Sequence, residues 1–201
     1  MDKKIIIVGG FHEIIELCEE LKYPIVGIID NTLKGKYLGY PIIGNDSDAS
    51  LLFKKFYNLP LVITPDTPLL REKLFGHYSK IGFKFETIIS SKAKISKSAQ
   101  IGTGTIIQSG VNISAKTRIG NFVKLNTNCN VMHDCLIHDY VTIAPNAVLL
   151  GHVTVSEKVY IGANSTILPT ISIGEDSLVG AGSVVTRNID NNITVKGVPA
   201  K

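Results

Sequence analysis

The chain has 201 residues, of which 44% are hydrophobic and 19% are charged, a composition that supports a packed core and excludes an intrinsically disordered protein. Its 21 basic and 17 acidic residues give a net charge of +4, and no segment gathers Lys and Arg, so we expect no nucleic-acid partner. The longest aliphatic run, residues 5–8, is far shorter than the roughly 20 residues of a membrane helix. Because the N-terminus also lacks a signal-peptide layout, we expect a cytoplasmic protein without membrane insertion.

The cysteines indicate a reduced protein. Cys18, Cys129 and Cys135 are an odd number in a chain without an export signal, which argues against a disulfide framework. We therefore predict that all three are small buried residues that fill the core.

Residues 1–88 alternate short aliphatic runs with amphipathic stretches, the pattern of a small α/β domain with a parallel sheet. A buried strand is predicted at 3–8, a glycine turn at Gly9 and Gly10, a helix at 11–21 and a second strand at 25–29. The remaining predicted elements are an extended piece at 41–44, a helix at 49–57, a strand at 61–64, a helix at 68–78 and a strand at 83–88.

The order of strand, glycine turn, helix, strand and acidic residue resembles the start of a Rossmann-like nucleotide-binding unit. In such units the helix N-terminus attracts phosphate and the acidic residue, here Asp30, reaches a ribose hydroxyl. The three-glycine pattern is absent, because His12 and Glu13 stand at its later positions. Nucleotide binding and a purely structural turn both remain open at this stage.

From Ile89 the sequence follows a period of six. All 17 residues at this spacing from Ile89 to Val185 are Ile, Leu or Val, and the residue four places after each of them is small or aliphatic and never charged. Neither a helix nor a plain strand has this period, whereas a parallel β-helix does. Three faces per coil give 18 residues per coil and nearly six coils. Glycines that follow the aliphatic residue, such as Gly102 and Gly120, are expected to take left-handed angles at the corners.

The chain resembles the hexapeptide-repeat acyltransferases, which have a left-handed β-helix. More narrowly, the chain resembles the sugar acetyltransferases that include bacillosamine-pathway and perosamine N-acetyltransferases and sialic acid O-acetyltransferases. Three features carry this resemblance: a Rossmann-like domain before the repeat, the segment Asn126-Thr127 followed by Val131-Met132-His133-Asp134-Cys135, and the tail 197–201. The resemblance implies a nucleotide-sugar-binding domain at 1–88, an acetyltransferase domain at 89–201, acetyl-CoA as acyl donor and a homotrimer.

Acetyl transfer from a thioester to a sugar amine or hydroxyl needs a base for the nucleophile and a donor for the developing oxyanion. His133, near a corner where a side chain points outward, is our candidate base, and Asp134 beside it would hold the imidazole in one tautomer. A polar corner residue without a catalytic role is the other interpretation of His133.

Gly151 stands eighteen residues after His133 and is predicted to lie directly beneath it in the next coil. A glycine there lets a ligand approach the backbone and leaves its N–H free for a carbonyl oxygen, although an ordinary corner glycine explains it equally well. The family resemblance assigns coenzyme A contacts to Gly151, and to Ala163 and Ala181, which we expect to stack on each other.

The resemblance also implies where the acceptor binds. Gly10, His12, Asp30 and Asn31 match positions that hold the nucleotide, and Asn126 matches a position near the acetyl group. Asn126 is equally consistent with one rung of an asparagine ladder, since Asn128 and Asn130 follow it. The identity of the base, or its absence, stays open.

Other classes fit less well. Carbonic anhydrases that share the β-helix bind zinc through three histidines, and although His133 and His138 have the spacing of two such ligands, Lys97 stands where the third would be. We therefore predict no metal and interpret His152 as a solvated corner or groove residue. A purely structural β-helix would need a regular threonine face, which is missing. The sequence predicts a trimeric N-acetyltransferase acting on a nucleotide-linked amino sugar, with sialic acid O-acetylation as the alternative.

Overall fold

The computed structural model describes residues 3–201, which divide into two compact units. One unit ends at Ile88, and the other comprises Ile89–Lys201 together with Thr67–Leu69. No helix among the described residues is long and apolar enough to cross a membrane.

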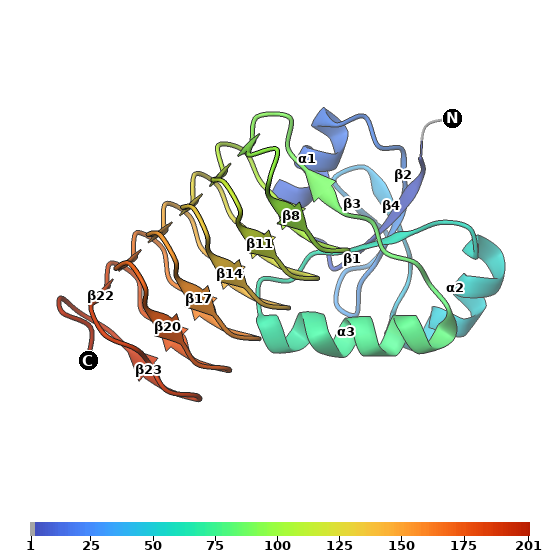
Figure 1. Cartoon of the computed structure of the whole chain (residues 1–201). Helices are drawn as coiled ribbons and strands as arrows, with labels where there is room; N and C mark the ends of the chain where they lie inside the picture. Colours follow the sequence, from blue (N-terminus) through green and yellow to red (C-terminus); the bar gives the residue numbers. More distant parts are fainter. Residues whose placement is uncertain (1–2) are drawn as a thin grey trace. The chain divides into compact units, whose positions relative to one another are not determined.

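The N-terminal unit is a five-stranded mixed sheet with helices (Figure 1). Its strands lie in the order β3-β4-β2-β1-β5 and are parallel except for the β3–β4 pair. The strand β1, which pairs with β2 on one side and β5 on the other, is entirely aliphatic and wholly buried. The strands are β1 (Ile5–Val8), β2 (Ile25–Ile29), β3 (Lys36–Tyr37), β4 (Tyr40–Gly44) and β5 (Leu61–Ile63). The helices are α1 (His12–Glu20), the short 3-10 helix η1 (Asp46–Asp48), α2 (Ala49–Phe56) and α3 (Pro68–Ile81).

Three parts of this unit differ from the prediction. Residues 83–88 do not form a strand of this sheet, because only Phe85 makes a bridge, to Leu61, and the ring of Phe83 packs against Phe53 with centroids 5.0 Å apart. Ile88 instead begins β6 of the β-helix. The pattern also missed β3, which has two residues, and it ended α3 three residues early.

The second unit is a left-handed parallel β-helix of about six coils, in which the short strands form three faces (Figure 1). The first face holds β6 (Ile88–Ile89), β9 (Ile106–Ile107), β12 (Lys124–Leu125), β15 (Thr142–Ile143), β18 (Tyr160–Ile161), β21 (Leu178–Val179) and β23 (Thr194–Val195). The second face holds β7 (Lys94–Ile95), β10 (Asn112–Ile113), β13 (Asn130–Val131), β16 (Val148–Leu149), β19 (Thr166–Ile167) and β22 (Val184–Val185). The third face holds β8 (Gln100–Ile101), β11 (Arg118–Ile119), β14 (Leu136–Ile137), β17 (Thr154–Val155) and β20 (Ser172–Ile173).

The six-residue period is the period of the core. The repeated aliphatic residues are buried in the middle coils, where Leu125 and Val131 are 0% exposed, while Ile89 at the first coil is 36% exposed. Strands pair with the strand eighteen residues later, as Arg118 does with Leu136. The stacked aliphatic side chains therefore fill the interior, as the period predicts.

The corner glycines have a different role from the one predicted. Left-handed angles occur at the second residue of each turn, for example φ 59° at Lys116 and 58° at Asp134, and not at Gly102 or Gly120. A Cβ on Gly102 would lie 2.4 Å from the carbonyl carbon of Gly120 in the next coil. These glycines are required because stacked coils approach too closely for a side chain.

Candidate active site

His133 projects from a turn between the second and third faces, which we call the histidine edge. It lies between Val131 and Cys135, whose side chains are buried in the core, so the turn directs the imidazole outward. The His133 side chain is 53% exposed. The structure confirms the predicted outward position at a corner.

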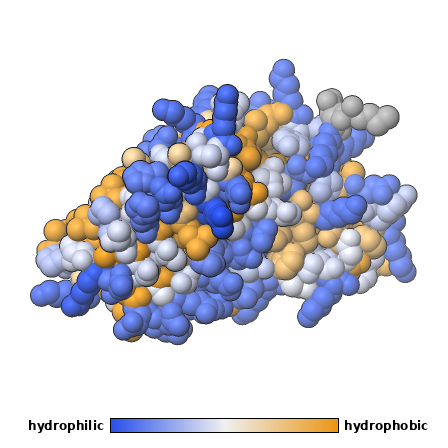
Figure 2. Space-filling model, viewed as in Figure 1, coloured by the Kyte–Doolittle hydropathy of each residue, from blue (hydrophilic) through white to orange (hydrophobic). Residues whose placement is uncertain are grey.

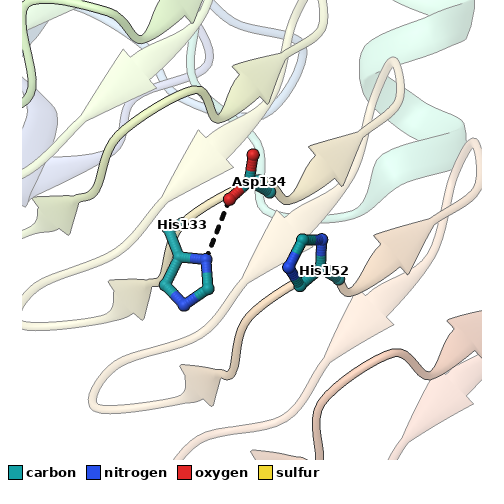
Figure 3. Close-up of side chains that lie close together, drawn as sticks. All are labelled: His133, Asp134 and His152. Carbon is teal, nitrogen blue, oxygen red and sulfur yellow. Dashed lines mark hydrogen bonds and ion pairs between the residues drawn. The ribbon is translucent and has the colours of Figure 1, made fainter.

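Asp134 holds the imidazole in place. Its Oδ2 lies 2.9 Å from His133 Nδ1, and this hydrogen bond is the main reason that the pKa of the Asp134 carboxyl lies below its ordinary value (Figure 3). An ionised carboxylate can only accept, so Nδ1 carries the proton and Nε2 of a neutral imidazole is left as an acceptor. That is the tautomer a general base requires.

Gly151 lies under the imidazole, as the coil arithmetic predicts. A Cβ placed on Gly151 would be 2.6 Å from Cε1 and 2.8 Å from Nε2 of His133. The Gly151 backbone N–H donates to no acceptor among residues 3–201, although the residue is buried. A free amide donor therefore lies next to the candidate base, the arrangement that oxyanion stabilisation needs.

His152 joins this cluster from the next coil. Its ring meets that of His133 nearly at right angles, with centroids 5.3 Å apart (Figure 3). Together with Asp134, the two histidines offer three potential metal-ligand atoms within 4.8 Å of one another. The sequence led us to interpret His152 as a solvated corner or groove residue but did not place it against His133.

A cavity of about 480 Å³ opens beside Asp134. Its lining residues are Ser98, Gln100, Lys116, Arg118, Asp134, Cys135 and Leu136. The sequence analysis missed Lys116 and Arg118, although Lys116 stands one 18-residue coil before Asp134 and the coil arithmetic used for Gly151 would have found it.

The residues predicted to contact coenzyme A do not all lie together within one chain. Ala163 and Ala181 stack in turns between the first and second faces, where Gly182 N–H donates to the Ala163 carbonyl at 2.8 Å. Asn126, 4% exposed, precedes the turn two coils earlier at this same edge, which we call the alanine edge. The second face separates the alanine edge from His133 and Gly151.

A second cavity, of about 200 Å³, lies at the carboxyl ends of β1 and β2. Asp30 and Asn31 line it, together with Asp46, and Asn31 donates to Asp46 Oδ2 at 2.6 Å. Gly10 lies behind this lining and His12 is elsewhere, since its Nε2 is 2.9 Å from Glu16 Oε1 on the exposed side of α1. Of the four predicted nucleotide contacts, two therefore line the cavity and two do not.

Asp30 organises the loops around this cavity. Burial alone would raise the pKa of its carboxyl, but hydrogen bonds from the backbone N–H groups of Gly10, Leu33 and Thr32 outweigh burial and hold that pKa below its ordinary value. The Gly10 N–H, 2.8 Å from Oδ2, is thus already engaged by protein.

Asp30→Asn should lower the free energy of unfolding by about 1–2 kcal/mol at neutral pH, because a neutral amide oxygen accepts these bonds more weakly. Since the folded-state pKa is depressed, the carboxylate's contribution is fully present above the unfolded pKa of about 3.9 and is lost as pH falls through the lower folded value. Chemical denaturation at pH 7 and near pH 3, followed by circular dichroism, measures both values. Asp190→Asn, an exposed carboxylate, is the control, and a penalty as large in acid as at neutrality would contradict the assignment.

Comparisons with known proteins agree with the fold. The family described as "Bacterial transferase hexapeptide (six repeats)" matches residues 116–151 and 152–187. PerB from Caulobacter crescentus, solved with CoA and GDP-perosamine, is 31% identical, with a TM-score of 0.93 over 98% of this chain and 96% of that one. The acetyltransferase domain of PglB from Neisseria gonorrhoeae, solved with acetyl coenzyme A, is 27% identical, with a TM-score of 0.92 over 100% and 99%.

WeeI from Acinetobacter baumannii is 28% identical, with a TM-score of 0.86 over 98% of this chain and 99% of that one. A comparison with curated protein sequences finds no match.

A β-helix built on six-residue repeats, with a histidine base candidate at one edge, defines a hexapeptide-type transferase. The full-length matches place it more narrowly: the chain belongs to the hexapeptide-repeat acetyltransferases, and it is an acetyltransferase.

Proposed function

We propose that this enzyme transfers the acetyl group of acetyl-CoA to the amino group of a nucleotide-linked amino sugar, such as a UDP- or GDP-4-amino-4,6-dideoxy sugar, in bacterial glycan biosynthesis. The observation that carries the proposal is the pairing of His133 with Asp134 directly over Gly151. Full-length similarity to PerB, solved with CoA and GDP-perosamine, supports both substrates.

His133 acts as the general base in this proposal. Its Nε2 takes a proton from the sugar amine as the nitrogen attacks the thioester carbonyl, and the Gly151 N–H stabilises the oxyanion that forms. The C–S bond then breaks, an amide remains on the sugar, and coenzyme A leaves as its thiol after taking up the proton. Asp134 positions the imidazole and stabilises its charged form.

Transfer is direct, without an acyl-enzyme. Cys129 and Cys135 are 0% and 2% exposed, and burial raises the pKa of Cys129 to about 12. The Cys135 thiol lies 3.1 Å from the Leu150 carbonyl and so points away from solvent. Neither sulfur is available as a thiolate nucleophile, so the amine itself attacks.

Two edges that one chain keeps apart would meet in a homotrimer. We place coenzyme A between the histidine edge of one copy, with Gly151, and the alanine edge of a neighbour, with Ala163, Ala181 and Asn126. The outward residues of the second face are uncharged from β10 to β22, and Figure 2 shows apolar residues among polar ones along the β-helix. An uncharged face is suited to packing against another copy. The five outward residues are Asn112, Asn130, Val148, Thr166 and Val184.

The N-terminal unit, residues 1–88, would hold the nucleotide. Asp30 and Asn31 present their side chains to the cavity at the ends of β1 and β2, and Gly10 supports the Asp30 carboxylate. His12 would contact the nucleotide only after its bond to Glu16 breaks. The reaction as proposed needs no metal, because a neutral amine and a thioester react with base and oxyanion assistance alone.

The test is coenzyme A release by the purified protein given acetyl-CoA with UDP-linked and GDP-linked 4-amino sugars and, separately, free sialic acid. Turnover on a nucleotide-linked amine, unaffected by EDTA and accompanied by a trimer in light scattering, is the expected result. Turnover on sialic acid alone would overturn the N-acetyltransferase proposal in favour of O-acetylation. Loss of activity with EDTA would show that the cluster with His152 holds a required metal.

A further inference from the structure

Two cations stand side by side on the coil that precedes His133. Lys116 is the second residue of its turn, Arg118 opens β11, and Thr117 between them is 0% exposed, so the two flanking side chains point outward together. Both line the cavity of about 480 Å³ described above. They therefore present two positive charges to the same open cavity.

Neither cation is neutralised by a close partner. The side chains of Lys116 and Arg118 form no ion pair or hydrogen bond with residues 3–201, and both residues are exposed. The one carboxylate on the cavity wall, Asp134, is already hydrogen bonded to His133. The coil that precedes Lys116 and Arg118 contributes only the neutral side chains of Ser98 and Gln100 to the cavity wall. The two cations outnumber the one carboxylate, so the cavity wall carries a net positive charge.

The position of these cations is fixed relative to the base. Asp134 N–H donates to the carbonyl of Ala115, so the turn of Lys116 stacks directly on the turn of His133, and Arg118 pairs with Leu136. Neighbouring coils are about 4.8 Å apart. An anion held by the two cations therefore lies one coil from the imidazole, within the span of a single sugar ring.

We propose that Lys116 and Arg118 form a subsite for the diphosphate of the acceptor, so that the sugar ring bridges the subsite and His133. This rests on the proposed function, because a nucleotide-linked sugar is the acceptor that carries a diphosphate next to the ring. Arg offers a planar fork and Lys a point charge, a combination that suits two adjacent phosphoryl groups. Anchoring the anion one coil away presents the far side of the ring to Nε2.

Binding of inorganic pyrophosphate tests the subsite without turnover. Calorimetry on the wild type, Lys116→Gln and Arg118→Gln should show the dissociation constant rising about 10-fold or more in each variant. Arg187→Gln is the matched control, because this exposed arginine follows β22 at the same edge, far from the cavity. Affinity that is unchanged in both cavity variants, or lost equally in the control, would overturn the proposal.

Kinetics identify the source of the anion. In Lys116→Gln and Arg118→Gln the KM for the nucleotide-linked amine should rise about 10-fold while the KM for acetyl-CoA stays constant. A rise in the acetyl-CoA KM instead would assign the cations to the coenzyme phosphates and overturn the proposal. If the wild type turns over the nucleotide-linked amine and neither substitution alters that turnover, the subsite proposal is wrong and the proposed function stands. If pyrophosphate binding depends on Arg118 but the wild type shows no turnover, the proposed function is wrong and the anion subsite stands.

Discussion

Replacing His133 with asparagine should lower kcat by about 10²- to 10⁴-fold, because the reaction then loses the base that accepts the amine proton. The dissociation constants of both substrates should change little, since the base acts in the transition state. Two structures of the Caulobacter relative in which one histidine is replaced, by alanine or by asparagine, still contain CoA and GDP-perosamine. Coenzyme A release gives kcat, and calorimetry gives the two affinities.

His138→Asn is the matched control for this experiment. His138 lies just after β14 on the third face, only five residues along the chain, and it is not part of the cluster of His133, Asp134 and His152. It should retain wild-type kcat and stability. If His133→Asn also retained full turnover, the base would have to be another group, and His152, whose ring meets that of His133, would be the next residue to test.

The repeat made the second unit predictable because every coil imposes the same requirement. Each face needs one large aliphatic side chain inside, so a fixed period of six fixes the strands, the faces and the stacking of Gly151 under His133. The N-terminal unit lacks such redundancy. There, residues 83–88 have the composition of a strand, yet aromatic packing of Phe83 decides their conformation, and no local pattern encodes that.

The site was predictable only where residues lie one coil apart. Ala163 lies five six-residue repeats after His133, and three such repeats make one coil. Because five repeats are not a whole number of coils, counting alone already places the two residues on different edges. The bond between His12 and Glu16 and the unpaired state of Lys116 and Arg118 depend on which partners lie within reach in three dimensions. Sequence spacing does not carry that information.

Gly151→Ala should lower kcat/KM by about 10²-fold, a loss that comparably small displacements of catalytic groups produce. The added Cβ would lie 2.6 Å from Cε1 of His133, so the imidazole must rotate away from the position in which Asp134 holds it. The backbone itself tolerates alanine here, because Ala115 occupies the equivalent turn position two coils earlier. Coenzyme A release measures the effect.

A double-mutant cycle separates displacement of the histidine from general damage. Overpacking of this kind costs about 1–3 kcal/mol, and in the His133→Ala background the methyl group gains the space that the imidazole leaves. The stability penalty of Gly151→Ala should therefore vanish in the double variant. Gly76→Ala, where an added Cβ meets nothing within 4 Å, should leave activity intact. A penalty of equal size with and without His133 would mean that Gly151 serves the coil stacking rather than the site.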